Sequence, residues 1–200
     1  MEFVFKLAIL IISVVAHEVA HGAMAYYFGD PTAKNQDRLT MNPIKHLDLF
    51  GSIILPVVLF LSGTNFLVGW AKPVPYNPYN LRNRRVGEIC VSLAGVIVNF
   101  LIALFFGLIL RFSESLGLSL PVQEIISYIV FINLVLMIFN LVPLPPLDGS
   151  KILLALIPYR YESIIRSIES YGIFVLIVFI VFFSAYLIIP VAWLFGLIVG

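Results

Sequence analysis

Long apolar runs constrain this chain more than any other feature. Three of them, 3–28, 89–112 and 125–141, approach or exceed the roughly 20 mostly apolar residues that a helix needs to cross a bilayer. A fourth run, 172–200, is long enough for a tilted span, and Pro190 is expected to kink it or divide it in two. Only 12% of the 200 residues are charged, against about 25% in soluble domains. The sequence therefore predicts an all-α polytopic membrane protein, a bundle of about four to six transmembrane helices.

The first apolar run is predicted to remain in the protein as a membrane helix. Residues 1–16 carry one lysine and end in Val14-Val15-Ala16, which loosely resembles the cleavage site of a secretory signal. Glu2 weakens the basic start of such a signal, however, and the apolar pattern continues past Ala16. An uncleaved first helix is therefore the favoured interpretation.

The segment 51–70 does not fit a simple span. Its apolar run, 53–61, is too short, contains Pro56 and is followed by a Ser-Gly-Thr-Asn turn signal. The loops on either side are rich in Lys and Arg, and such loops normally face the cytoplasm. Both loops can face the cytoplasm only if 51–70 enters the membrane and returns. The sequence therefore predicts a re-entrant element between the first two core helices.

The same orientation brings two polar features to one membrane depth. The first helix would run from outside to inside, and the two helices after the re-entrant element would exit and return. The segment Asn140–Lys151 is then expected in the cytoplasmic half, at the depth of His17 and His21.

No second domain is expected. Residues 1–200 are interpreted as a single membrane-embedded domain, with a core of about 1–158 and one or two accessory helices in 171–200. The net charge of +1 provides no basic surface that would indicate nucleic acid as a partner. The lipid bilayer is the expected environment, and the sequence does not specify an oligomeric state.

Two histidines and a glutamate interrupt the first apolar run. His17 and His21 are four residues apart, so they lie on one face of a helix and can both offer an imidazole nitrogen to one metal ion. Glu18 lies beside them, where it suits a general base acting on a water molecule that the metal activates. Catalytic zinc has three protein ligands and an open position. The pattern therefore predicts a zinc site that needs a third ligand from elsewhere in the chain.

Asp148 is the third ligand that the sequence favours. Asp30, Asp37 and Asp48 lie in a basic loop, where they are interpreted as solvent-exposed charges and not as metal ligands. Asp148 instead follows an apolar helix and a run of three prolines, which forbid a continuous helix, so it is predicted to lie on unwound backbone at membrane depth. A lone carboxylate near the bilayer centre costs about 2.5–3.5 kcal/mol, and coordination to a cation would offset that cost.

Two motifs occur in a fixed order along the chain. His-Glu-x-x-His spans His17–His21, and Asn-x-x-Pro-x-Pro-x-Leu-Asp-Gly spans Asn140–Gly149 with every fixed position matched. A third element, Gly95–Asn99, has the form Gly-x-x-x-Asn and lies on the helix between them. In this combination the chain resembles the site-2 protease family of intramembrane zinc metalloproteases, over most of its length from the first helix to about Pro158.

The resemblance implies a catalytic zinc site and a substrate class. It implies one Zn²⁺ ion per chain with three ligands: His17, His21 and Asp148. It also implies that Glu18 is the catalytic base and that the substrate is a membrane-spanning protein, cleaved within or near the bilayer as in regulated intramembrane proteolysis.

Three asparagines within the apolar runs have two interpretations. The resemblance implies that Asn99 and Asn140 support the active site or bind substrate, but each could also serve only as an interhelical hydrogen-bonding group. For Asn133 the interhelical role is favoured.

The compact layout resembles the small members of the family, without a PDZ or CBS domain. It implies a multi-pass protein of a prokaryotic plasma or inner membrane, with the active site in the cytoplasmic half. The alternative function is a polytopic metal-ion transporter or a metal-binding membrane scaffold. A transporter needs ligands on both sides of the midplane, and the other apolar runs contain no further His, Asp or Glu.

The stretch Gly69–Pro75 is predicted to be extended. A helical substrate must unwind to expose its carbonyl groups, and we hypothesise that the unwound segment pairs with this stretch. Pro73 and Pro75 have no N–H group, so they limit how far such pairing could extend.

Overall fold

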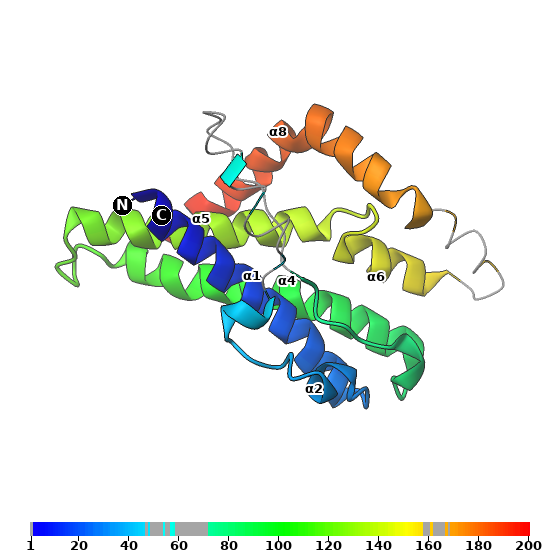
Figure 1. Cartoon of the computed structure of the whole chain (residues 1–200). Helices are drawn as coiled ribbons and strands as arrows, with labels where there is room; N and C mark the ends of the chain where they lie inside the picture. Colours follow the sequence, from blue (N-terminus) through cyan, green and yellow to red (C-terminus); the bar gives the residue numbers. More distant parts are fainter. Residues whose placement is uncertain are drawn as a thin grey trace.

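A computed structural model gives the arrangement of the helices (Figure 1). It describes residues 2–46, 48, 54, 57–58, 72–157, 161, 167 and 169–200. Within these residues four helices are long and apolar enough to cross a membrane: α1 (Glu2–Tyr27), α4 (Arg84–Arg111), α5 (Leu120–Leu141) and α8 (Gly172–Val199). The described part of the chain contains no strand. The predicted all-α polytopic membrane fold is confirmed.

Short helices connect the long ones. Two follow α1 and one precedes α4: α2 (Thr32–Asn35), η1 (Pro43–His46) and η3 (Pro78–Asn80). The last, α6 (Asp148–Leu156), follows α5. The predicted re-entrant element, 51–70, falls almost entirely outside the described residues, so it stays a prediction.

The starts of α4 and α5 were predicted too late from the apolar runs alone. The Asn83 side chain accepts the N–H of Val86 and so caps α4, which begins at the polar residue Arg84. Pro121 lies in the first turn of α5, where its missing N–H leaves no helical hydrogen bond unmade. Helix starts depend on capping as well as on hydrophobicity, which explains the difference.

The helix α4 lies at the centre of the fold and packs against α1, α5, α6 and α8. Buried residues recur along it at every fourth position: Gly87, Val91, Gly95, Asn99, Ala103 and Gly107. A spacing of four residues turns this ridge by about 40° per step around the helix axis. The ridge therefore meets different partners in turn, and small residues let each partner approach closely.

The helix α8 is continuous, with Pro190 inside it, so the C-terminal run is not divided in two. It contacts the rest of the described molecule near its two ends. Gly172 packs against Pro145, while Val191 and Ile198 belong to the apolar core shared with α4 and α5.

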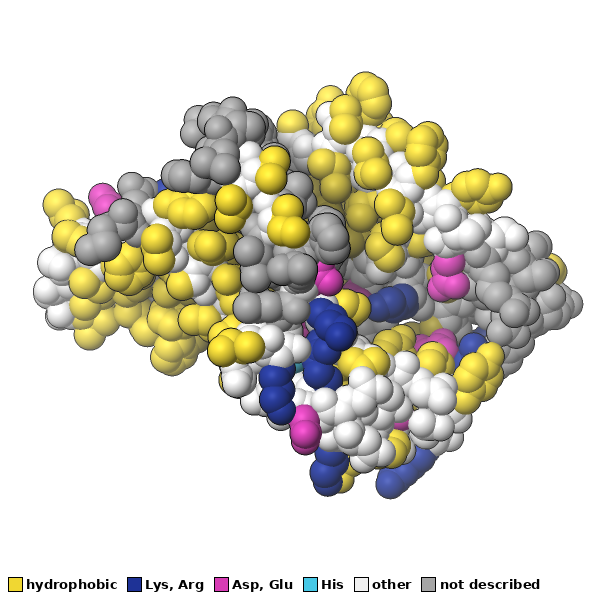
Figure 2. Space-filling model, viewed as in Figure 1, with side chains coloured by type: hydrophobic (Ala, Val, Ile, Leu, Met, Phe, Trp, Pro, Cys, Tyr) yellow, Lys and Arg dark blue, Asp and Glu magenta, His cyan; other side chains and the backbone are white. Residues whose placement is uncertain are grey.

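The surface of the molecule is apolar over most of its long helices. Figure 2 shows hydrophobic side chains over α8 and the outer parts of α4 and α5, whereas Lys and Arg gather toward the lower part of the view, around α2. Phe105, Phe182 and Trp193 are 62–68% exposed. Soluble proteins rarely expose apolar patches beyond a few hundred Å². The chain is a multi-pass membrane protein, and lipid covers these side chains.

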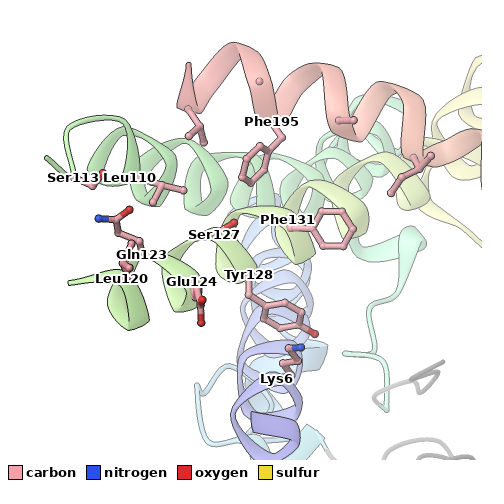
Figure 3. Close-up of a pocket in the computed structure, with 14 residues that line it drawn as sticks. Lys6, Leu110, Ser113, Leu120, Gln123, Glu124, Ser127, Tyr128, Phe131 and Phe195 are labelled. Carbon is pink, nitrogen blue, oxygen red and sulfur yellow. The ribbon is translucent and has the colours of Figure 1, made fainter. Parts of the chain in front are cut away.

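An open groove of about 1000 Å³ separates part of α5 from the C-terminal part of α8 (Figure 3). Phe131 and Phe195 line its apolar side, and Gln123, Tyr128 and Lys6 line its polar side. None of the predicted site residues lines this groove. The predicted chemistry therefore lies elsewhere, between α1, α4 and α6.

Candidate metal centre

His17 and His21 of α1 and Asp148 of α6 converge on one point. His17 Nε2 lies 2.9 Å from His21 Nε2 and 3.1 Å from Asp148 Oδ2. His21 Nε2 lies 3.0 Å from the same Asp148 oxygen. Only 6–8% of each side chain is exposed. The predicted convergence of these residues, 131 positions apart for His17 and Asp148, is confirmed.

The two imidazoles turn lone pairs toward Asp148. His17 Nδ1 donates to Asn99 Oδ1 at 2.8 Å, and His21 Nδ1 donates to the Val91 carbonyl at 2.6 Å. A neutral imidazole with its proton on Nδ1 presents a lone pair at Nε2. Together with the carboxylate, three acceptor atoms therefore face one another at 2.9–3.1 Å. Such an arrangement is repulsive unless a cation lies between them.

This donor set fits a zinc ion. Two imidazoles and one carboxylate are typical ligands of catalytic zinc, which keeps a fourth position open. In a tetrahedral site with bonds of about 2.1 Å, ligand atoms lie about 3.4 Å apart. The observed triangle needs to expand only slightly to reach that spacing. The residues present could therefore hold the metal.

Asp148 reaches the cluster because the chain turns back directly after α5. In 142–147, the N–H of Leu144 bonds to the Val142 carbonyl and the N–H of Leu147 bonds to the Leu144 carbonyl. Asp148 then begins α6, so the prediction that it lies on unwound backbone was wrong, and the unwound part ends at Leu147. A carboxylate is favourable in a first helical turn, where the peptide dipoles present positive charge.

Gly95 leaves the space that the His17 ring occupies. A Cβ atom at this position would lie 2.6 Å from Nδ1 and Cε1 of His17. Asn99, one turn further along α4, then reaches the same ring with its amide oxygen. The Gly-x-x-x-Asn element therefore has a physical basis here: Gly95 admits the ring and Asn99 orients it.

Glu18 is held by the backbone of another segment. The N–H of Val74 donates to Glu18 Oε2 at 2.8 Å. Val74 is buried, and Arg38 anchors the residues before it by donating to the carbonyls of Lys72 and Pro73 at 2.8 and 3.3 Å. A fixed peptide group thus orients the predicted base, a contact that no local sequence signal indicates.

This contact limits the hypothesis of substrate pairing along Gly69–Pro75. The N–H groups of Lys72 and Val74 already donate to the His46 carbonyl and to Glu18. The two prolines have no N–H. Donors for pairing with a substrate would therefore have to come from 69–71, outside the described residues.

Asp30 was predicted to be a solvated charge, and this prediction was wrong. It is fully buried, and its carboxylate accepts four hydrogen bonds. Two come from Thr32, one from the N–H of Asn77 at 2.6 Å and one from the Asn80 side chain at 2.7 Å. Burial raises the pKa of Asp30, but these hydrogen bonds outweigh burial and hold that pKa below its usual value. Asp30 therefore ties the end of α1 to the segment that carries Val74.

The three asparagines differ in position. Asn99 contacts His17 directly, and Asn133 joins α5 to α4 and α1 through Asn99 and Ser13, as expected of an interhelical group. The Asn140 side chain donates to the Leu136 carbonyl of its own helix. Among the described residues no hydrogen bond links Asn140 to the metal cluster, so its supporting role stays a prediction.

Lys151 was missed by the sequence reasoning. Its Nζ lies 3.2 Å from Asp148 Oδ1, the oxygen that does not face the histidines. The three-residue spacing of an acid and a base on a helix is the signal that could have indicated this pair.

Comparisons with known proteins place the chain among metalloproteases. The model of peptidase family M50 matches residues 113–183. The chain is 40% identical over 188 residues to "Putative zinc metalloprotease YwhC" of Bacillus subtilis, in an alignment that covers 90% of this chain and 82% of that protein.

More distant relatives carry a similar name. The chain is 26% identical to "Putative zinc metalloprotease Rip2" of Mycolicibacterium smegmatis, over 90% of this chain and 67% of that protein. It is 28% identical to the protein of the same name from Mycobacterium tuberculosis, over 98% of this chain and 72% of that protein. No solved structure matches the chain.

Proposed function

Because this chain belongs to peptidase family M50, the site-2 protease family, we propose that it is an intramembrane zinc endopeptidase. Its substrates are membrane-spanning proteins, which it cleaves within or near the bilayer in regulated intramembrane proteolysis. The observation that carries the proposal is the convergence of three buried lone-pair atoms beside Glu18 in a multi-pass membrane protein.

We assign the metal site to three ligands and one ion per chain: His17, His21 and Asp148. Zinc, when bound there, supplies the Lewis acidity that activates water and polarises the peptide carbonyl. The chain's own residues orient the ligands. Asn99 and the Val91 carbonyl hold the two imidazoles, and Lys151 holds the second oxygen of Asp148.

We assign Glu18 as the general base. Val74 occupies its Oε2, so Oε1 is the oxygen that accepts a proton from the attacking water and later delivers it to the leaving nitrogen. Because the Val74 N–H fixes the carboxylate plane, the base does not have to be ordered when substrate arrives.

The active site is assigned to the cytoplasmic half of a prokaryotic plasma or inner membrane. The basic side chains cluster around α2 and the neighbouring loops, which supports a cytoplasmic location for that end of α1. Asn140 is kept as a candidate substrate-binding or supporting residue. It lies in the last turn of α5, shortly before the turns that lead to Asp148.

The test is a pair of substitutions in the purified full-length protein, assayed with a model transmembrane substrate and by zinc analysis. Glu18→Gln is expected to lower the cleavage rate by about 10²–10⁴-fold, because proton transfer is lost, with zinc content unchanged. Asp148→Ala is expected to lower zinc content instead, because one ligand is removed.

The alternative function predicts a different result. A metal-ion transporter reconstituted in vesicles would keep most of its metal flux in the Glu18→Gln variant and would not cleave the substrate. Cleavage at the wild-type rate by Glu18→Gln would contradict the assignment of the base.

A further inference from the structure

A row of buried polar side chains leads from the metal centre into the helix bundle. His17 Nδ1 donates to Asn99 Oδ1, Asn99 Nδ2 donates to Asn133 Oδ1 at 3.1 Å, and Asn133 Nδ2 donates to Ser13 Oγ at 2.9 Å. We propose that Asn133 and Ser13 are positioning residues for His17, acting through Asn99. This inference rests on the proposed function, because it takes His17 to be a metal ligand.

The direction of each hydrogen bond in the row follows from one backbone carbonyl. The Ile129 carbonyl can only accept, and Asn133 Nδ2 lies 2.9 Å from it. The amide of Asn133 is thereby oriented with Oδ1 toward Asn99. That oxygen also can only accept, so Asn99 must turn its own Nδ2 toward it.

The orientation of Asn99 selects the tautomer of His17. With its Nδ2 directed at Asn133, Asn99 presents Oδ1 to the imidazole at 2.8 Å. Only an N–H can satisfy that oxygen, so the imidazole proton lies on Nδ1 and the lone pair lies on Nε2. Nε2 is the nitrogen that faces His21 and Asp148.

His21 shows the same logic in a shorter form. Its Nδ1 donates directly to the Val91 carbonyl, so a backbone acceptor sets its tautomer without an intermediate. His17 points to a different part of α4, where Gly95 and Asn99 lie, and its tautomer is set by a backbone acceptor on α5 through two amides.

The row is buried in the helix bundle. Asn99 and Asn133 are fully buried and Ser13 is nearly so, so bulk water cannot replace a hydrogen-bond partner that is lost. If the Asn99 amide turned over, its Nδ2 would face the Nδ1–H of His17 and its oxygen would face Asn133 Oδ1. Because Ser13 lies one turn before His17 on α1, the row also returns to its starting helix and sets how α1 faces α4 and α5.

The test measures zinc affinity of the full-length protein by competition with a chromophoric chelator. Asn133→Leu is expected to weaken zinc binding because the Asn99 amide loses the partner that orients it; loss of a direct outer hydrogen bond to a ligating histidine costs about 10–100-fold, which sets the upper limit. The matched control is Gln123→Leu, which removes an amide on the same helix that donates to the Leu118 carbonyl, outside the row and away from the metal cluster. Its zinc affinity is expected to stay within about twofold of wild type.

A second measurement separates positioning from general packing. The chain has three histidines, so ¹⁵N-histidine labelling gives few ring signals, and the tautomer of His17 can be followed after zinc is removed, when coordination no longer fixes it. Wild type is expected to carry the proton on Nδ1, and Asn133→Leu is expected to lose that preference. If both leucine variants lower only the unfolding temperature, with affinity and tautomer unchanged, the inference is overturned.

A double substitution tests whether the residues act in series. Asn133→Leu in an Asn99→Leu background is expected to weaken zinc binding no further, because the link to His17 is already broken. Ser13→Ala is expected to have a smaller effect than Asn133→Leu, because the Ile129 carbonyl still orients Asn133. Additive losses would contradict the series. A wild-type protein without zinc would overturn the proposed function and this inference together, whereas equal affinities in wild type and Asn133→Leu would overturn this inference alone.

Discussion

At the residue scale, the geometry of the proposed metal centre depends on single atoms. A methyl group at Gly95 would occupy the position of the His17 ring, and a reversed amide at Asn99 would present the wrong group to it. Glu18 likewise depends on one N–H, that of Val74. The cluster therefore tolerates little change in side chains that do not themselves touch a metal.

Gly95→Ala is predicted to weaken zinc binding by tenfold or more, because the added Cβ would lie 2.6 Å from the His17 ring and must displace it. The measurement is the same chelator competition. Gly196→Ala is the matched control, a helical glycine with open space around its Cβ position, and its affinity should equal that of wild type. Equal affinity in Gly95→Ala would show that α1 and α4 can separate without harming the site.

At the scale of elements, α4 and the segment 72–80 position the site. The ridge of buried residues at every fourth position of α4 lets α1 approach closely at Gly95 and α8 at Gly107, because these residues are small. The segment 72–80 is fastened to α1 by Asp30 and by the Val74 contact with Glu18. In lipid there is no hydrophobic force between apolar helices, so such close packing and polar contacts hold the elements together.

Asp30→Asn is predicted to destabilise the protein by about 1–3 kcal/mol at pH 7, because an amide cannot accept all four hydrogen bonds. The pKa of Asp30 is lowered in the folded protein, so its contribution is present above the unfolded pKa, about 3.9, and is lost as the pH falls through the folded value. The difference in unfolding temperature between wild type and variant should therefore shrink at the acid end.

Asp37→Asn is the matched control for Asp30→Asn. Asp37 is exposed in the same loop, at φ 51°, a conformation that asparagine also adopts. Asp37→Asn should have the same Tm as wild type at every pH. A Tm difference for Asp30→Asn that did not change with pH would contradict the role of the Asp30 charge.

At the scale of the whole molecule, the proposed metal site joins α1 to α6 through residues 131 positions apart. Its three acceptor atoms repel one another when no cation is present, so under the proposal the binding energy of the ion contributes to folding. The long apolar helices around them expose large side chains such as Phe174 and Phe182 to lipid, which contributes little to specificity.

Removal of zinc by a strong chelator is predicted to lower the unfolding temperature of the wild-type protein in detergent. A site held at a free zinc concentration 1,000 times its Kd contributes about 4 kcal/mol, so a shift of several degrees is expected. Asp148→Ala should unfold at one temperature with or without chelator. If the chelator left the unfolding temperature of the wild-type protein unchanged, the ion would not join α1 to α6.

Local patterns in the sequence were sufficient to predict the membrane class, the long helices and the cluster of His17, His21 and Asp148. Apolar run length predicts spans because every buried peptide group in lipid must bond within its own helix. Four-residue spacing puts His17 and His21 on one face, and the charge of the loops predicts that Asp148 lies at their depth.

Packing alone settled the contacts that act across long sequence separations. The start of α6 at Asp148, the burial of Asp30, the hold of Val74 on Glu18 and the row from Ile129 to His17 left no local signature. Each depends on which groups meet when helices approach, and a hydrogen-bond partner 34–82 residues away is chosen by geometry rather than by neighbours in the sequence.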